Sequence, residues 1–292
     1  MESNQTITVV PGIRVGHWTD LENASGVTVI DLPEPNRAAF EARGGAPGTR
    51  ETALLAPSMK IETIQSIVFS GGSAFGLAAA DGVMGELAAA GRGHPTPAGP
   101  VPIVPAAILY DLFVGENRPP TAEDGAAAFR AATVDPVSLG TVGAGTGATV
   151  SKWSGFENMR KAGIGSAATR VGRATVGVLA AVNAVGDVVD LHGDWLTGGP
   201  TLQPPEVSGS RQNTTLVSLA TDADLNKSDL LRMIVRCHDA LAATLRPAHT
   251  RFDGDIVFAV SCGEEEADLD LLGEVAFNST AAAIVSSVKN AT

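Results

Sequence analysis

The sequence predicts a layered α/β protein, and three observations lead to this fold class. Short apolar runs with the composition of strands alternate with longer helical segments that are apolar on nearly all sides, so the helices are expected to pack against sheets. Only 18% of the 292 residues are charged and 44% are hydrophobic, which indicates a large core in one large domain or two small ones. The 33 glycines and the aromatic share of 4% favour close backbone contact over filling by bulky side chains.

The first half of the chain is expected to hold several strands and two helices. Val27–Ile30 is a β-branched run typical of a strand, and Ile64–Phe69 predicts the next strand, which leads straight into Ser70-Gly71-Gly72-Ser73. Ala74–Ala90 predicts an apolar core helix, which Gly91 ends. The other elements expected here are strand and turn at residues 7–10 and 13–18, an apolar run at residues 106–110 and a short helix at residues 121–132.

The second half alternates strands with helices in the same way. Thr175–Val182 predicts a strand that stops at Asn183, while residues 195–213 are polar and rich in glycine and proline, as expected of a loop. Thr215–Thr221 predicts the next strand. The remaining expected elements are a return strand at residues 186–189, a helix at residues 229–245 capped by Asn226 or Ser228, a strand at residues 256–260 and an apolar helix at residues 273–288.

Charge and composition exclude several classes of partner. The formal net charge of −12 argues against nucleic-acid binding, because an acidic surface repels phosphate. No signal peptide is recognisable and no run of about 18 apolar residues could span a membrane, so we expect a cytoplasmic protein without a membrane partner. Two cysteines are too few for a disulfide framework, and the five scattered histidines lack zinc-ligand spacing. We therefore expect no metal.

The junction between Asn213 and Thr214 is the most informative place for chemistry. A polar loop runs directly into a buried strand that begins with a hydroxyl residue. Self-cleavage requires this arrangement: the Thr214 hydroxyl attacks the Asn213 carbonyl, and the released α-amine then acts as base for the same hydroxyl. A threonine that begins a strand is also a common structural residue, so the junction alone leaves both interpretations open.

Two further segments carry groups that such chemistry needs. The carboxylates of Asp253-Gly254-Asp255 could hold an α-ammonium group and set its proton affinity, or they could shape a turn. A calcium loop would need a longer series of acidic ligands and a distal glutamate. The strand-to-helix turn Ser70-Gly71-Gly72-Ser73 offers backbone N–H groups to a negative charge, as an oxyanion hole or a phosphate loop, or it is a tight structural turn. It lacks the spacing and the Lys-Ser/Thr of a Walker motif.

Three single residues are candidates on the same grounds. Lys152 follows a glycine-alternating segment, but Ser151 stands where a phosphate loop needs glycine, so Lys152 is either a charge near the nucleophile or an exposed lysine. Asn183 ends an apolar strand, where its amide could donate to an oxyanion or cap a turn. Tyr110 is the only tyrosine, and its position after an apolar run predicts a buried hydroxyl that needs a partner.

Together these segments resemble one family of self-processing N-terminal nucleophile hydrolases over nearly the whole chain. The family contains the L-aminopeptidase/D-amidase-esterases, the β-peptidyl aminopeptidases and the 6-aminohexanoate (nylon) oligomer hydrolases. The segments that carry the resemblance most specifically are Phe69-Ser70-Gly71-Gly72-Ser73-Ala74-Phe75-Gly76-Leu77, Asn213-Thr214-Thr215-Leu216-Val217 and Asp253-Gly254-Asp255.

The resemblance implies a four-layer αββα sandwich, related to ornithine acetyltransferase, in which one precursor becomes two chains of a homo-oligomer, with a tetramer expected. The Asn-Thr pair, the Asp-Gly-Asp element and Lys152 are closer to the nylon-oligomer branch than to the β-aminopeptidases, which carry Ser and Glu at the two carboxylate positions. The site residues that it implies are Thr214 as nucleophile, Asn183 for the oxyanion, Tyr110 as lining, and Gly71 and Gly72 close by.

We therefore expect residues 1–292 to form a single hydrolase domain that cleaves itself into residues 1–213 and 214–292. Thr214 would then hydrolyse amides of short peptides or ω-amino-acid oligomers through an acyl-enzyme without a cofactor, and Asp253 and Asp255 would orient its ammonium group. Two alternatives remain open, an acyl transferase like ornithine acetyltransferase and an uncleaved oligomeric protein that binds a ligand without catalysis. The sequence does not distinguish α- from β-peptides or D- from L-residues.

Overall fold

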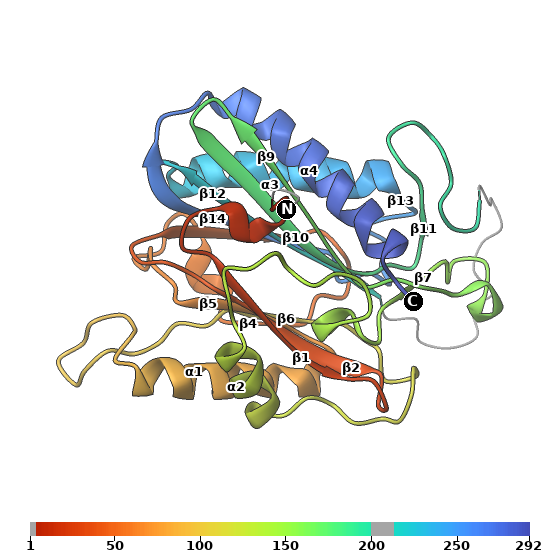
Figure 1. Cartoon of the computed structure of the whole chain (residues 1–292), viewed down its shortest axis with the longest axis horizontal. Coiled ribbons are helices and arrows are strands. Elements are labelled where there is room, and N and C mark those ends of the chain that lie inside the picture. Colours follow the sequence, from red (N-terminus) through yellow and green to blue (C-terminus); the bar gives the residue numbers. More distant parts are fainter. Residues whose placement is uncertain (1–3, 200–212) are drawn as a thin grey trace.

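The computed structural model describes residues 4–199 and 213–292, and its main elements form four layers. Two five-stranded sheets lie face to face, and a pair of helices covers the outer face of each sheet (Figure 1). The strand orders are β1-β2-β5-β6-β4 in the first sheet and β3-β14-β12-β10-β9 in the second. The α/β class and the αββα layers that the sequence predicts are therefore confirmed.

The first sheet comes from the N-terminal part of the chain and packs against α1 and α2. The cap of α2 is a reciprocal pair, in which Thr121 and Asp124 each bond the other's backbone N–H. The buried core of this layer contains Val29, Val68 and Val83. The bounds are β1 Arg14–Asp20, β2 Ser25–Asp31, β4 Thr49–Arg50, β5 Ser66–Ser70, β6 Ala106–Ile108, α1 Ala79–Ala89 and α2 Ala122–Arg130.

The second sheet is built around two long central strands, β10 and β12, and packs against α3 and α4. The chain leaves β12, passes through α3 and returns as β14, which pairs with β12 in parallel. Asn226 caps α3 and is one of the two caps, with Ser228, that the sequence predicts. The bounds are β3 Arg37–Ala42, β9 Ile164–Val171, β10 Ala174–Asn183, β12 Thr214–Ala223, β14 Ile256–Glu265, α3 Lys227–Thr244 and α4 Leu269–Lys289.

The inner core lies between the two sheets. Phe69 of β5 meets Phe258 of β14 with ring centroids 6.2 Å apart, and both side chains are fully buried. All seven residues of β2 and nearly all of β10 and β12 are buried, because each sheet is covered on both faces. The starts and ends of these central strands are therefore rigid positions for functional groups.

Short elements connect the layers. They are the 3-10 helices Ile7–Val9, Ala53–Leu55, Ser73–Ala78, Gly143–Gly145 and Phe156–Asn158 and the two-residue strands β7 Thr149–Val150, β8 Arg160–Lys161, β11 Asp187–Val188 and β13 Leu245–Arg246.

Several expected elements differ from the structure. Residues 7–9 form a 3-10 helix instead of a strand, because Ile7 donates its N–H to the Ser166 side chain at 2.9 Å and not to a strand partner. The helix expected at Ala74–Ala90 begins as a 3-10 helix and becomes α-helical only at Ala79. The sequence analysis missed β3 and β9. Of the loop expected at residues 195–213, residues 200–212 lie outside the described residues.

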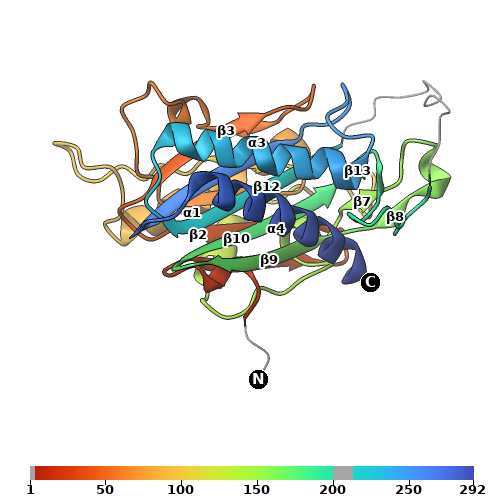
Figure 2. The ribbon, with the colours of Figure 1, turned by 90° about the horizontal axis from the view of Figure 1, so that it is seen from above.

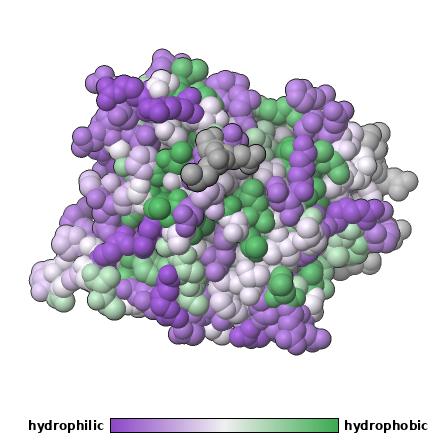
Figure 3. All heavy atoms as spheres, viewed as in Figure 1, coloured by the Kyte–Doolittle hydropathy of each residue, from purple (hydrophilic) through white to green (hydrophobic). Residues whose placement is uncertain are grey.

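Among the described residues, α4 is the one helix that is long and apolar enough by composition to cross a membrane. Half of that apolar segment is buried inside the protein, and α4 packs along α3 and over β9 and β10 (Figure 2). The core helix of a layered protein has the same composition. On the face that Figure 3 shows, apolar residues lie in small groups among polar ones.

Candidate active site

The expected nucleophile lies at the end of the second sheet where two central strands meet. Thr214 is the first residue of β12 and lies opposite Asn183, the last residue of β10, in the antiparallel register. Thr214 is only 3% exposed. One residue earlier, Asn213 forms an isolated parallel bridge with Asp253. The fold therefore brings Asn183, Asn213, Thr214 and Asp253 together at this end of the sheet.

The carbonyl of Asn213 is held by close contacts. Gly254 donates its backbone N–H to this carbonyl oxygen at 2.7 Å, and the Thr214 hydroxyl lies 2.5 Å from the same oxygen. A Cβ atom at position 254 would lie 2.8 Å from the Thr214 hydroxyl and 2.6 Å from the Ala46 carbonyl oxygen. Only glycine fits between the two aspartates without moving these groups.

Lys152 is fully inside the protein and points at Asn183. Its ammonium group donates to the Asn183 side-chain oxygen at 2.9 Å, to the Asn183 carbonyl at 3.2 Å and to the Thr149 hydroxyl at 3.1 Å. Burial lowers the pKa of Lys152 to about 7, against the opposing charges of Asp253 and Asp111. The interpretation of Lys152 as an exposed lysine is therefore wrong.

The amide of Asn183 is oriented from both ends. Its oxygen accepts from Lys152, and its nitrogen donates to the Tyr110 carbonyl at 3.0 Å. Tyr110 is half-buried, and its ring packs on Phe113 with centroids 5.7 Å apart. Tyr110 thus contacts the site through its backbone carbonyl, whereas the prediction from the sequence concerned its hydroxyl.

Asp255 connects the start of β12 to a histidine. One carboxylate oxygen accepts the backbone N–H of Thr215, next to the nucleophile, at 2.8 Å. The other oxygen accepts the backbone N–H of His249 at 2.9 Å and lies 2.8 Å from the Nδ1 atom of the same residue. Asp255 is 1% exposed, so these hydrogen bonds replace water.

Asp253 is equally buried but has other partners. Val185 donates its N–H to one oxygen at 3.2 Å, while Thr250 donates its N–H and its hydroxyl to the other oxygen at 3.1 and 2.5 Å. Burial first, and then the negative charge of Asp255, raise the pKa of Asp253 to about 6. The two carboxylates therefore share a desolvated site in which a nearby cation would be held strongly.

The turn at Gly71, Gly72 and Ser73 follows β5, but its N–H groups already have acceptors. Gly71 donates to the Gly26 carbonyl at 2.9 Å, Gly72 to the Asp111 carboxylate at 2.7 Å and Ser73 to the Leu109 carbonyl at 2.8 Å. These three N–H groups are thus not free to bind an oxyanion in this structure. A role in lining the substrate site stays a prediction.

Sequence reasoning missed two polar residues in this network and left a third unused. Asp111, 2% exposed, binds the Gly72 N–H and the Ser25 hydroxyl, and burial raises its pKa to about 6. Thr149 holds Lys152, and His249 holds Asp255. The available signals were weak: Asp111 directly follows the only tyrosine, and Thr149 precedes Lys152 by three positions.

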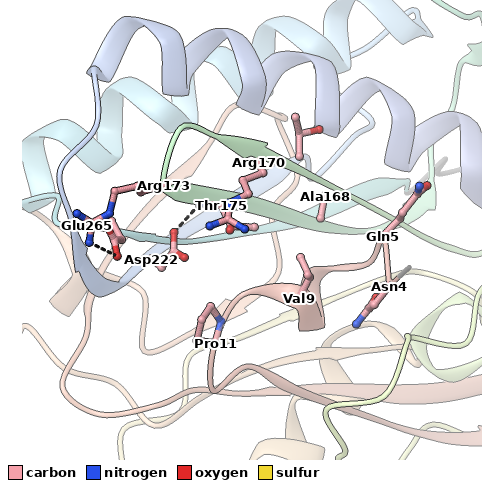
Figure 4. A pocket seen from close by; sticks show the side chains of 11 residues that line it. Asn4, Gln5, Val9, Pro11, Ala168, Arg170, Arg173, Thr175, Asp222 and Glu265 are labelled. Carbon is pink, nitrogen blue, oxygen red and sulfur yellow. Dashed lines mark hydrogen bonds and ion pairs between the residues drawn. The ribbon is translucent and has the colours of Figure 1, made fainter. Parts of the chain in front are cut away.

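A hollow of about 460 Å³ lies away from this site, around Thr175 and Asp222 (Figure 4). These residues lie at the opposite ends of β10 and β12 from Asn183 and Thr214. Two pairs of residues that line the hollow bond each other: Arg173 bonds Glu265 at 2.9 Å, and Thr175 donates its N–H to Asp222 at 2.5 Å. Within residues 4–199 and 213–292, no group of three or more His, Cys, Asp or Glu side chains could hold a metal ion.

Comparison with known proteins identifies the family of the chain. The model of Peptidase family S58 matches residues 5–292. An uncharacterized aminopeptidase of Mycobacterium tuberculosis is 42% identical over 288 residues, which cover 88% of this chain and 81% of the relative. A 6-aminohexanoate-oligomer endohydrolase of Paenarthrobacter ureafaciens is 27% identical over 302 residues, which cover 95% of this chain and 81% of the relative.

Solved structures share the fold. The L-aminopeptidase D-Ala-esterase/amidase of Ochrobactrum anthropi, described as a variant of the Ntn hydrolase fold, superposes with a TM-score of 0.80 at 22% identity and covers 99% of this chain and 86% of its own. A β-aminopeptidase of Burkholderia sp. superposes with a TM-score of 0.78 at 21% identity, with coverage of 98% and 86%.

Proposed function

The chain belongs to peptidase family S58 and is an amide hydrolase, and from this premise we propose that it cleaves itself between Asn213 and Thr214 and then uses Thr214 as an N-terminal nucleophile. The observation that carries the proposal is the Asn213 carbonyl. Gly254 donates to its oxygen at 2.7 Å, and the Thr214 hydroxyl lies beside it. Membership of a peptidase family sets aside the alternative of a non-catalytic binding protein.

In the self-cleavage step, the Thr214 oxygen adds to the carbonyl carbon of Asn213. The hydroxyl proton passes to the Thr214 nitrogen, and the peptide C–N bond breaks while an ester C–O bond forms. Negative charge develops on the Asn213 oxygen, where the Gly254 N–H stabilises it. Water then hydrolyses the ester, which leaves a carboxylate on Asn213 and a free α-amine on Thr214.

In turnover, the α-amine of Thr214 accepts the proton of its own hydroxyl, which attacks the carbonyl of the substrate amide. The leaving amine takes that proton, and water releases the acyl group from the Thr214 oxygen. Asn183 carries two hydrogens on its side-chain nitrogen, and one of them is used by the Tyr110 carbonyl. We assign the second hydrogen to the substrate oxyanion, with Lys152 fixing the amide orientation.

We assign the carboxylates of Asp253 and Asp255 to the new ammonium group of Thr214. In support, the Asp255 carboxylate accepts the N–H of the neighbouring Thr215, and the backbone of Asp253 pairs with Asn213, the residue before the cut. Negative charge in a desolvated site favours the protonated amine, so the pair would set the proton affinity of the base as well as its orientation.

A cut at this bond would leave the two fragments assembled. In the second sheet, β12 and β14 of residues 214–292 lie between β10 and β3 of residues 1–213. The hydrogen bonds of both strand pairs and the shared core would remain. Self-cleavage therefore exposes a new terminus without separating the layers, which suits an activation step.

The names of the relatives suggest the substrate class, namely short peptide amides or oligomers of ω-amino acids. A homo-oligomeric state and a cytoplasmic location remain parts of the proposal. The test combines denaturing mass spectrometry of the purified protein with turnover of an aminoacyl p-nitroanilide and of a 6-aminohexanoate oligomer. We expect Thr214→Ser to cleave and hydrolyse at reduced rates, and hydrolysis that is unchanged in Thr214→Ala would contradict the proposal.

A further inference from the structure

His249 lies behind Asp255 and makes two contacts with the same carboxylate oxygen. Its backbone N–H donates to that oxygen at 2.9 Å, and its Nδ1 atom lies 2.8 Å away. The other oxygen of Asp255 accepts the N–H of Thr215 at 2.8 Å. Asp255 is thus clamped between His249 and the start of β12, immediately beside Thr214.

The backbone of His249 is in an unusual conformation that this clamp requires. Its φ angle of 54° lies in the left-handed region, which residues other than glycine seldom occupy, although asparagine, aspartate and histidine do so more often than the rest. Such strain persists only where the surrounding contacts over-determine it, and it gathers at functional sites. Here it lets the N–H and the ring of one residue reach one oxygen of Asp255.

The charges around the ring favour a proton on His249. Burial lowers its pKa, but the hydrogen bond and the charge of Asp255 outweigh burial and raise the pKa of His249 above its ordinary value. The positive charge of Arg43, which follows β3 and pairs with Glu41 at 3.2 Å, lowers the pKa of His249. His238 of α3 faces the ring with centroids 4.9 Å apart, and burial lowers its pKa to about 3, so it stays neutral.

We propose that His249 is the positioning residue of Asp255: its ring holds the carboxylate toward β12, and its positive charge opposes the uptake of a proton by the Asp253–Asp255 pair. The inference rests on the proposed function, because the pair acts on the Thr214 amine. Without the imidazolium charge, two neighbouring buried carboxylates would take up a proton at higher pH. The acid limit of activity therefore depends on a residue that does not contact the substrate.

Two variants that both tolerate the left-handed backbone separate the charge of the His249 ring from its hydrogen bond to Asp255. His249→Asn keeps a side-chain donor and tolerates the left-handed conformation but carries no charge. His249→Gly adopts this φ freely and keeps the backbone N–H, but it has no side-chain donor. The matched control is His192→Asn, which removes an exposed imidazole in the loop after β11.

The measurement is kcat/KM for an aminoacyl p-nitroanilide as a function of pH. We expect the acid limb to move to higher pH by about one unit in His249→Asn, since an opposite charge beside a carboxylate shifts its pKa by about that much or more. His249→Gly should also lose about 10- to 100-fold on the plateau, as when an orienting partner is removed, and His192→Asn should match the wild type. If His249→Asn is active and its acid limb has not moved, the inference about His249 is overturned while the proposed function stands.

NMR titration of the histidine rings gives a second readout that needs no turnover. The pKa of His249 should fall in Asp255→Asn, because the carboxylate that raises it is gone. An unchanged His249 pKa in that variant would refute the charge coupling even if the protein cleaves itself. A wild-type protein that neither cleaves itself nor hydrolyses amides would instead refute the proposed function, and the inference with it.

Discussion

The backbone N–H of Gly254 donates a 2.7 Å hydrogen bond to the carbonyl oxygen of Asn213. Gly254 lies between the two buried aspartates, so one short segment supplies both the carboxylates and the donor at the bond that we expect to be cut. The donor comes from the backbone of a covered strand end and is therefore fixed before any reaction begins. A preorganised donor at a developing oxyanion is among the largest contributions to acyl-transfer catalysis.

Replacing Gly254 with alanine should slow self-cleavage by about 10²- to 10³-fold, the usual cost of losing an oxyanion donor. The new methyl group would lie 2.8 Å from the Thr214 hydroxyl and must displace it or the N–H. The check is the time course of precursor loss after refolding from denaturant. Gly85→Ala is the control, since a Cβ there meets nothing within 4 Å. Gly254→Ala cleaving as fast as this control would contradict the role of the N–H.

Asp253→Asn and Asp255→Asn should fold normally but lose about 10²- to 10⁴-fold in self-cleavage and amide hydrolysis, as in a general-base defect. Asparagine preserves the shape and removes the charge that acts on the Thr214 amine. Circular dichroism serves as the folding control. If both variants work at near wild-type rates, the two aspartates only maintain the shape of the turn and take no part in catalysis.

The same Asp253→Asn variant should change stability with pH in a defined direction. Because the pKa of Asp253 is raised from 3.8 to about 6, the native state binds its proton more tightly than the unfolded state. The wild type therefore loses stability as the pH rises from about 4 to 6, and the loss is constant above that. Asparagine does not titrate, so the variant should gain roughly 2–3 kcal/mol relative to wild type across this window. Urea unfolding at each pH measures this, with exposed Asp135→Asn as the flat control.

Lys227 at the start of α3 joins the two expected fragments. Its ammonium group is buried, and four backbone carbonyl oxygens in the segment before β5 lie within hydrogen-bond distance of its three hydrogens. Lys227→Met should lower the free energy of unfolding by about 1.5–3 kcal/mol, since charged hydrogen bonds are lost, while exposed Lys289→Met should not. Equal stability of the two variants would rule out this link. The four acceptors, with their distances from Nζ, are Leu54 at 3.3 Å, Ala56 at 3.4 Å, Met59 at 3.4 Å and Ile61 at 2.5 Å.

Activity should survive exhaustive chelation. In the proposed mechanism the nucleophile carries its own base, so no step requires a metal ion. The measurement is amide turnover after dialysis against EDTA. Loss of activity that zinc or calcium restores would instead make Asp253 and Asp255 metal ligands.

The strands that the sequence predicts well are those covered on both faces. Val27–Ile30, Ile64–Phe69 and Thr215–Thr221 consist mainly of apolar and β-branched residues, because both faces of these strands are buried. The edge strands gave no such pattern: β3 mixes charged residues with alanine, and β9 is rich in glycine, serine and alanine. Residues 7–9 carry an apolar run, but the tertiary hydrogen bond to Ser166 overrides its strand propensity.

Most of the candidate site could be predicted from short motifs, whereas its hydrogen-bond partners could not. The Asn213-Thr214 junction and the Asp253-Gly254-Asp255 element are local patterns that the sequence displays directly. The clamp on Asp255 by His249 depends on a left-handed backbone angle, and the contact of Asp111 with Gly72 joins residues 39 positions apart. Neither leaves a periodic or spacing signal in the sequence.

The most direct test of the account is denaturing mass spectrometry of the purified wild type beside Thr214→Ala. We expect the wild type to separate into residues 1–213 and 214–292, with an N-terminal sequence of Thr214-Thr215-Leu216 on the second fragment. Thr214→Ala should remain a single species of 29.7 kDa without amidase activity, because no hydroxyl can attack the Asn213 carbonyl. A Thr214→Ala protein that is still cut at this bond, or an intact wild type that hydrolyses amides, would contradict the central claim.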